Sequence, residues 1–285
     1  MTSKEEPRAS MRVGRFELPS DRCLVMGILN ITPDSFSNGG EHFDHQVAVE
    51  AAQQMVADGV DLIDIGGEST RPGADPVSVE QEMDRVLPVI EALQTVGVPL
   101  SLDSRRAPVV QRAMAIGIDL VNDVDGFRSA DMQALVPSII DRGLMVCVMH
   151  MQGEPQTMQT DPHYEDVVSE VYGFLRAQRD RLVARGLDQS QILLDPGFGF
   201  GKTLAHNQAL FTAIGQQASR LPLLIGVSRK RMIGQLSGRG EDRAADRLGG
   251  SLAAAVLAAQ SGARVVRVHD VRQTVDALRV LNGLG

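Results

Sequence analysis

A set of polar residues recurs along this sequence, each at or near the end of a short apolar run. The set combines carboxylates, carboxamides and imidazoles with the cations of one lysine and one arginine. Carboxylate and amide oxygens accept hydrogen bonds from N–H groups, whereas ammonium and guanidinium groups bind carbonyls and anions. These residue types suit a flat heterocycle attached to an anionic group. The set comprises Asn30, Asp64, Asp103, Asn122, His150, Asp195, Lys230, Arg267 and His269.

The acceptors and the lysine in this set match one kind of heterocyclic edge. A 2-amino-4-oxo-pyrimidine presents adjacent N–H donors and one carbonyl acceptor. A carboxylate can take the two donors as a bidentate pair, and an ammonium can take the carbonyl. We therefore expect Asp103, Asn122 and Asp195 on one wall of a pocket and Lys230 on another.

Basic residues gather near the ends of the last two apolar runs. Arg267 and His269 are two residues apart on one run, so both side chains can point the same way and reach a single anion. The Ser228-Arg229-Lys230 trio ends the preceding run, and Arg71 follows Thr70 after an earlier one. The alternative is that these cations form ion pairs with an acidic surface.

The elements that position these residues are apolar runs that alternate with helical patterns. Eight such units favour a (β/α)8 barrel, because a doubly wound sheet usually has fewer strands. In such barrels the carboxyl ends of the strands form the active site. The runs expected to be strands are 24–29, 61–67, 98–102, 119–121, 144–149, 192–194, 223–227 and 263–269. The helical patterns cover 46–57, 79–93, 106–115, 132–140, 164–184, 209–218, 246–261 and 271–281.

The chain of 285 residues is expected to form a single barrel domain over residues 11–285. Residues 1–10 mix charged residues and proline without an apolar core, which predicts a disordered tail and no signal peptide. Residues 12–18 fit a small hairpin across the bottom of the barrel.

Composition excludes several classes of partner. The formal net charge of −8, with no cluster of Lys and Arg, argues against a nucleic-acid surface. No apolar run approaches the ~18 residues that would span a bilayer. Cys23 and Cys147 are too few for a disulfide framework, which fits a reducing cytoplasm. The six histidines have no zinc-ligand spacing.

The glycine-rich run 196–203 ends in Gly-Lys-Thr like a phosphate-binding P-loop. The motif fails, because the position that requires its first glycine holds Pro196. The glycines are instead expected to let the backbone approach a flat ligand beside Asp195.

The segment from Asn30 to about Phe43 is expected to be a functional loop. Pro33 and the Gly39-Gly40 pair break regular structure there, and its length exceeds the usual connection. Phe36 gives the loop an aromatic tip, which predicts a lid.

The sequence resembles bacterial dihydropteroate synthase over nearly its whole length. The resemblance implies a (β/α)8 transferase of folate biosynthesis, inhibited by sulfonamides and commonly a homodimer. It would join (7,8-dihydropterin-6-yl)methyl diphosphate to p-aminobenzoate and release diphosphate. The motifs that carry it lie at 26–40, 63–73, 103–104, 122–123, 149–153, 194–202, 226–230 and 267–270.

The resemblance also implies roles for individual residues. The pterin pocket would comprise Asp103, Asn122, Met149, Asp195, Phe200 and Lys230. The diphosphate side would comprise Asn30, Thr70, Arg71, Arg267 and His269, with Asn30 contacting Mg²⁺. The p-aminobenzoate side would comprise Phe36, Thr70, Pro72, Ser228 and Lys230. The catalytic set would be Asp103, Lys230, Arg267 and His269.

The expected reaction is an SN1-like substitution at the pterin methylene, with C–O cleavage ahead of attack. Asp103 would offset the developing positive charge, while Mg²⁺, Arg71, Arg267 and His269 would stabilise the departing diphosphate. Two rivals are a barrel that passes a methyl group from methyltetrahydrofolate to a corrinoid protein and a non-catalytic pterin-binding paralogue. Both should lack the lid and the Arg267/His269 pair.

Overall fold

A computed structural model describes residues 10–32, 41–68, 77–154, 156–240 and 243–284 of the chain, apart from the side chains of residues 41–44. Within these residues, eight parallel strands form one sheet, ordered β8-β7-β6-β5-β4-β3-β10-β9. A bridge between Leu194 and Leu223 joins the two edges, so the sheet closes into the predicted barrel. The strands are β3 (Leu24–Asn30), β4 (Leu62–Gly66), β5 (Leu100–Asp103), β6 (Leu120–Asp123), β7 (Met145–Met149), β8 (Ile192–Asp195), β9 (Leu224–Ile225) and β10 (Val265–Val268).

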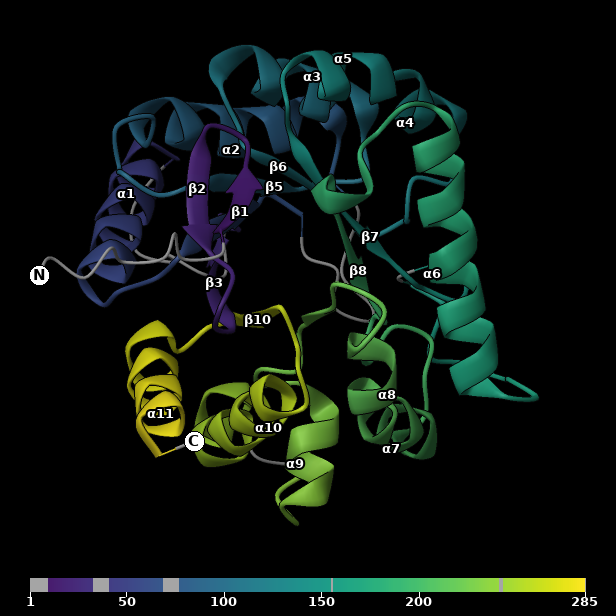
Figure 1. Cartoon of the computed structure of the whole chain (residues 1–285). Coiled ribbons are helices and arrows are strands. Elements are labelled where there is room, and N and C mark those ends of the chain that lie inside the picture. The colour runs from purple at the N-terminus through teal and green to yellow at the C-terminus, as the bar shows by residue number, and fades with distance from the viewer. Residues whose placement is uncertain (1–9, 33–40, 69–76, 155, 241–242, 285) are drawn as a thin grey trace, which may run out of the picture.

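Helices surround the strands on the outside of the barrel (Figure 1). They are α1 (Glu41–Ala57), α2 (Val79–Ala92), α3 (Ala107–Ile116), α4 (Ala130–Ala134), α5 (Val136–Asp141), α6 (Val167–Ala184), α7 (Leu204–Thr212), α8 (Ile214–Ala218), α9 (Arg231–Leu236), α10 (Leu248–Gln260) and α11 (Val271–Leu284). Short 3-10 turns precede β8 and α10, at Gln189–Gln191 and Ala244–Arg247. None of the described helices is long and apolar enough to cross a membrane.

The strands are apolar on both faces because each face is covered. Outward side chains such as Val25, Ile63 and Val121 belong to the large core between the barrel and the helices. A second, smaller core fills the barrel and contains Leu62, Leu120, Leu193 and Val265 among its members. Since side chains alternate along a strand, residues two positions further on point into the same interior. Those positions carry polar residues.

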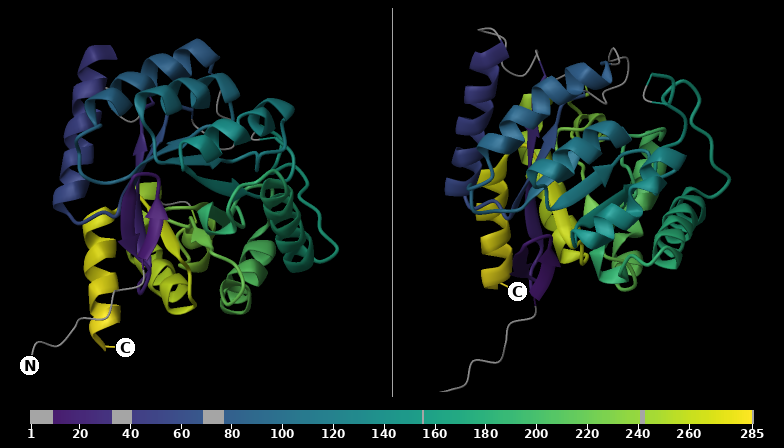
Figure 2. Two further views of the ribbon diagram at one scale, coloured as in Figure 1. Left: turned by 45° about the horizontal axis from the view of Figure 1, so that its top comes forward. Right: turned by 90° about the horizontal axis from the view of Figure 1, so that it is seen from above.

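The predicted hairpin is confirmed as β1 (Ser10–Val13) paired antiparallel with β2 (Phe16–Pro19). It lies across one end of the barrel, where Val13 joins the inner core (Figures 1 and 2). Ser10, predicted to end the tail, is instead the first residue of β1; residues 1–9 lie outside the described residues.

Several predicted helices differ from the observed ones. The pattern at 132–140 forms two helices, because Pro137 lacks an N–H and starts a new helix at Val136. The pattern at 209–218 also forms two, and α7 begins at Leu204 behind a Thr203 capping box. Helix α9 was not predicted; it is short and contains Gly234. Helix α1 begins five residues before the predicted start, which shortens the predicted loop.

Candidate active site

The predicted polar residues of the first strands lie at one level of the barrel. Asp103 on β5 pairs in register with Gly66 on β4 and with Asn122 on β6. Asn30 at the end of β3 pairs with the same Gly66. Four neighbouring strands therefore end together, and their inward side chains form one wall at the carboxyl end of the barrel.

Asp64 is the centre of this wall. Its carboxylate accepts hydrogen bonds from Ser101 Oγ at 2.5 Å, Asn122 Nδ2 at 3.1 Å and Arg267 Nε at 2.6 Å. The residue is fully buried. A buried carboxylate requires this many partners, because an unpaired charge in the interior is costly. Asp64 therefore fixes the orientation of the Asn122 side-chain amide, whose Nδ2 donates to it.

Arg267 connects Asp64 to Asp103, since its Nη2 donates to Asp103 Oδ2 at 2.7 Å. Burial raises the pKa of Asp103 to about 7, and the charge of Arg267 opposes that rise. Burial alone would lower the pKa of Arg267, but the two carboxylates raise it above its ordinary value. The guanidinium predicted for the diphosphate side is thus also part of the carboxylate wall.

Lys230 follows β9 and lies near Asp195, which ends the neighbouring strand β8, so Asp195 is on the side of Lys230 and not on a separate wall with Asp103 and Asn122 as expected. Its Nζ donates to the carbonyl oxygen of Phe198 at 2.5 Å and lies 4.6 Å from the centre of the Phe200 ring. Burial lowers the pKa of Lys230 to about 8, although the charge of Asp195 opposes the change. Burial raises the pKa of Asp195, whose Oδ1 accepts from the backbone N–H of Gly197 at 2.7 Å.

Apolar side chains cover the space beside these polar groups. Met149 pairs in register with Asp195, and its side chain belongs to a small cluster with Met151 and Met158. Phe200 packs against that cluster from the loop after β8. A planar ring can lie against such a surface while its edge meets the carboxylates; the pterin contacts of Met149 and Phe200 stay a prediction.

Hydrogen bonds and an ion pair join the residues that follow β9 to those that follow β10. Ser228 Oγ accepts from the backbone N–H of His269 at 3.2 Å and lies 3.1 Å from its Nδ1. Arg229 donates to both carboxylate oxygens of Asp270, at 3.0 and 2.5 Å. The serine predicted for p-aminobenzoate and the histidine predicted for diphosphate are therefore direct neighbours.

Four predicted site residues lie outside the described residues: Phe36, Thr70, Arg71 and Pro72. The lid prediction falls on the same segments and stays a prediction. Asn30 and Glu68, which lie near the described ends of the two segments, have positions in the structure. Glu68 pairs with Arg106 at 2.8 Å and with Arg105 at 3.4 Å.

Asp64 was included among the polar strand ends expected from the sequence, but no role was predicted for it. His150 was also expected to lie with the other polar strand ends. Asp64 follows the inner-core residue Leu62 by two positions, the same relation that Asn122 has to Leu120. That spacing could have identified it as a wall residue. His150 does not join the wall; its buried ring contacts Lys202.

Mg²⁺ fits this end of the barrel only as an ion shared with a ligand. Among the described residues, no group of three or more His, Cys, Asp and Glu side chains is arranged to hold a metal ion. Mg²⁺ is commonly held by one or two protein oxygens together with substrate phosphates. The amide oxygen of Asn30, at the carboxyl end of β3, is compatible with such a site.

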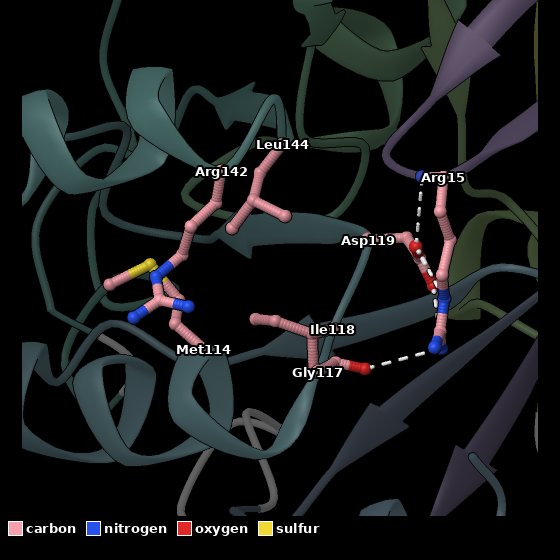
Figure 3. Close-up of a pocket in the computed structure, with 7 residues that line it drawn as sticks. All are labelled: Arg15, Met114, Gly117, Ile118, Asp119, Arg142 and Leu144. Atoms are coloured by element: carbon pink, nitrogen blue, oxygen red, sulfur yellow. Dashed lines mark hydrogen bonds and ion pairs between the residues drawn. The ribbon is translucent and has the colours of Figure 1, made fainter.

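A cavity of about 240 Å³ lies at the opposite end of the barrel (Figure 3). Its lining includes Ile118 and Leu144, which precede β6 and β7, and Asp119, which binds Arg15 of the hairpin at 3.1 Å. None of the predicted site residues lines it. The carboxyl end of the barrel is therefore the candidate active site.

A (β/α)8 barrel with this carboxylate, amide and lysine pocket is the architecture of a pterin-binding enzyme. The chain belongs to that family: the model described as "Pterin binding enzyme" matches residues 26–269. The dihydropteroate synthase of Neisseria meningitidis serogroup B is 48% identical over 280 residues, covering 96% of this chain and 97% of the relative.

Solved structures agree with this assignment. The dihydropteroate synthase of Xanthomonas albilineans with 4-aminobenzoic acid has a TM-score of 0.88 at 44% identity, covering 96% of this chain and 97% of that one. The Yersinia pestis enzyme in a sulfonamide drug complex has a TM-score of 0.88 at 44% identity, with 97% and 99% covered. The resemblance read from the motifs is confirmed.

Proposed function

We propose that this chain condenses (7,8-dihydropterin-6-yl)methyl diphosphate with p-aminobenzoate to give 7,8-dihydropteroate and diphosphate. The observation that carries the proposal is the cluster of polar groups at the carboxyl end of the barrel: buried acceptors on β4 to β6, and Asp195 on β8 near Lys230. The relatives at 44 to 48% identity that bear the name dihydropteroate synthase support the same activity.

The pterin ring is bound through its edge and its faces. The Asp195 carboxylate takes the two adjacent N–H donors, and the Lys230 ammonium donates to the ring carbonyl. Asn122 supplies its free amide oxygen, because its Nδ2 is committed to Asp64. Met149 and Phe200 contact the ring faces. This arrangement leaves the methylene carbon toward Asp103 and Arg267.

The reaction begins with cleavage of the methylene C–O bond, whose electron pair leaves with the diphosphate. The electron-rich pterin shares the positive charge, and the Asp103 carboxylate offsets it. Arg267 and His269 stabilise the leaving diphosphate. The amine lone pair of p-aminobenzoate then forms the C–N bond, and the nitrogen loses a proton. A neutral aromatic amine needs no strong base.

Mg²⁺ is the proposed cofactor, bound by the amide oxygen of Asn30 together with the substrate's diphosphate. When bound, it would neutralise charge on the leaving group. Among the protein's own side chains, Arg267 and His269 are proposed to neutralise charge on the diphosphate, together with Thr70 and Arg71.

The p-aminobenzoate site is proposed beside Ser228 and Lys230, with Phe36, Thr70 and Pro72 completing its walls. Ser228 is buried, and its hydroxyl is already oriented by His269. Since His269 belongs to the diphosphate side, binding at one side should affect the other. We expect Mg²⁺-diphosphate to tighten p-aminobenzoate by about tenfold or more, a coupling of ~1.4 kcal/mol or above.

Calorimetry tests this coupling and separates the rivals. p-Aminobenzoate is titrated into the protein alone and into the protein saturated with Mg²⁺ and diphosphate. Equal affinities would contradict the shared site. A methyl-transferring barrel would bind methyltetrahydrofolate and show no diphosphate dependence, whereas a non-catalytic paralogue would bind the pterin diphosphate without turnover.

Sulfonamides are proposed to compete with p-aminobenzoate, as the Yersinia pestis complex suggests for that enzyme. We further propose a cytoplasmic homodimer. Both cysteines are free thiols, which fits a reducing compartment, and large apolar side chains are exposed on the adjoining helices α9, α10 and α11, at Leu236, Leu257 and Val280, which fits a subunit contact. Sedimentation equilibrium of the purified chain tests the dimer.

A further inference from the structure

Lys202, the lysine of the failed P-loop motif, points into the protein. Its Nζ lies 3.1 Å from His150 Nδ1, 3.3 Å from the carbonyl oxygen of His150 and 2.9 Å from that of Phe200. The residue is 3% exposed. Burial lowers the pKa of Lys202 to about 7, and even its ammonium form, with three N–H donors, meets three acceptors. Lys202 therefore has no donor left for a phosphate group.

His150 is built to accept from this lysine. Burial lowers its pKa to about 3, so the imidazole is neutral, and an accepting Nδ1 requires the proton on Nε2. The ring packs edge-on against Phe174, with centroids 5.1 Å apart. Tyr164 lies beside it and donates its hydroxyl to the carbonyl oxygen of Gly201 at 2.9 Å. The loop after β8 is thus bound to the end of β7 and to the segment that precedes α6.

The same loop carries both groups that hold Lys230. The Phe198 carbonyl accepts from its Nζ, and the Phe200 ring lies under it. Gly197 and Gly201 have positive φ values of 67° and 61°. A Cβ on Gly197 would collide with the carbonyl oxygen of His150, so the loop lies directly against the end of β7. Small displacements of this loop would therefore move the partners of Lys230.

We propose that Lys202 is a positioning residue for pterin binding: its three hydrogen bonds fix the loop 196–203, so that Phe198 and Phe200 hold the Lys230 ammonium toward the ring carbonyl. Lys202 itself touches no substrate. The inference rests on the proposed function, because the ring that Lys230 binds is the pterin.

Lys202→Met tests the inference, because methionine keeps most of the side-chain length and removes all three donors. Calorimetry with a diphosphate-free pterin should show a dissociation constant raised by about tenfold or more. Asp61→Asn is the matched control: it weakens a partly buried ion pair with Arg22, 2.5 Å long, at the other end of the barrel. It should lower Tm and leave pterin affinity within about twofold. A Lys202→Met protein that binds pterin within about threefold of wild type would overturn the inference.

A double-mutant cycle with Phe200→Leu distinguishes positioning from general destabilisation. If Lys202 acts through the loop, adding Phe200→Leu to Lys202→Met should cost less affinity than Phe200→Leu costs in the wild type. Additive losses would refute the mechanism. Should Lys202→Met not fold, His150→Phe removes the Nδ1 acceptor while keeping an aromatic ring. It should weaken pterin by about threefold or more, and unchanged affinity would count against the proposal.

Amide hydrogen exchange provides a readout that needs no ligand. In Lys202→Met, amides 197–203 should exchange faster, while those of β5 and β6 keep their wild-type rates. Uniform acceleration, or none, would overturn the inference. A wild-type chain that binds pterin but forms no product would refute the proposed function and leave this inference to its own tests. A wild type that binds no pterin would refute both.

Discussion

Arg267 donates to Asp103 at 2.7 Å from one side of its guanidinium and to Asp64 at 2.6 Å from its Nε. The two carboxylates lie on neighbouring strands, β4 and β5, and the arginine reaches them from β10. Asp64 is fully buried, and the Asp103 side chain is 13% exposed. The charge proposed to face a pterin methylene cation is therefore held in place by the arginine that is also proposed to bind the leaving group.

Asp103→Asn should lower kcat by on the order of 10²-fold, with a much smaller loss of pterin affinity. The amide keeps the shape of the side chain and one acceptor for Arg267, but it removes the negative charge opposite the developing cation. Steady-state kinetics together with pterin calorimetry measure the two effects separately. A kcat within about threefold of wild type would rule out this role.

Asp64→Asn should destabilise the protein by about 3 to 5 kcal/mol. An asparagine oxygen can still accept from Asn122 and Arg267, and its NH₂ can donate to Ser101 Oγ, but the substitution removes the buried negative charge that pairs with the Arg267 guanidinium. Urea unfolding measures the loss. Ser101→Ala is the control, since it removes one of the three donors and should cost only about 1 kcal/mol. Equal losses for the two variants would argue against Asp64 as the centre of the wall.

The effect of pH on stability should identify the Asp103 titration. Burial raises the pKa of Asp103 from its ordinary 3.8 to about 7, so the folded protein keeps a proton that the unfolded chain releases in this range. The contribution of Asp103 to the free energy of unfolding therefore falls as pH rises from about 4 to about 7. Asp103→Asn removes that fall.

Urea unfolding of both proteins between about pH 5 and pH 8 checks this expectation. The free energy of unfolding of the variant minus that of the wild type should rise across the range by about 1 kcal/mol or more. Loss of the Arg267 partner shifts every point by a similar amount, because arginine keeps its charge throughout. A flat or falling difference would show that Asp103 is ionised in the folded protein well below pH 7.

Arg229 should reveal a balance between backbone strain and its ion pair. Its φ of 60° is left-handed, a conformation that costs a non-glycine residue roughly 1 kcal/mol or more. Arg229→Ala loses the Asp270 pair and keeps the strain, whereas Arg229→Gly loses the pair and relieves it. Both should raise the KM for p-aminobenzoate, because Ser228 and Lys230 flank this residue.

The two Arg229 variants differ in stability. In urea unfolding, the free energy of unfolding of Arg229→Gly should be about 1 kcal/mol higher than that of Arg229→Ala. Equal stabilities would mean that the left-handed turn is unstrained, and an unchanged KM in both would mean that the Asp270 pair does not position the site.

The sequence predicted most of the wall because strand geometry is local. A polar residue two positions after an inner-core residue must point into the barrel, which is how Asn122 follows Leu120 and Asp195 follows Leu193. Eight alternating units then leave few ways to arrange the strands. The fold and the polar strand ends were therefore predictable from the alternation of the units, whereas the resemblance added the substrates and the residue roles.

The sequence could not predict contacts that depend on side-chain direction in loops. Whether Lys202 binds a phosphate or points inward is decided by the glycine turns of the loop and by His150, which is 52 residues away. Arg267 was expected to bind an anion or to pair with an acidic surface, because its spacing from His269 says nothing about Asp64 on β4. Helix α9 is too short to show a period, and its neighbours determine it.

The most direct test is to incubate the purified chain with (7,8-dihydropterin-6-yl)methyl diphosphate, labelled p-aminobenzoate and Mg²⁺, and to follow the label and the diphosphate together. We expect the label in 7,8-dihydropteroate with one diphosphate released for each product, suppressed by a sulfonamide and reduced by on the order of 10²-fold in Asp103→Asn. Intact substrates after prolonged incubation of a folded, pterin-binding wild-type protein would contradict the proposed activity.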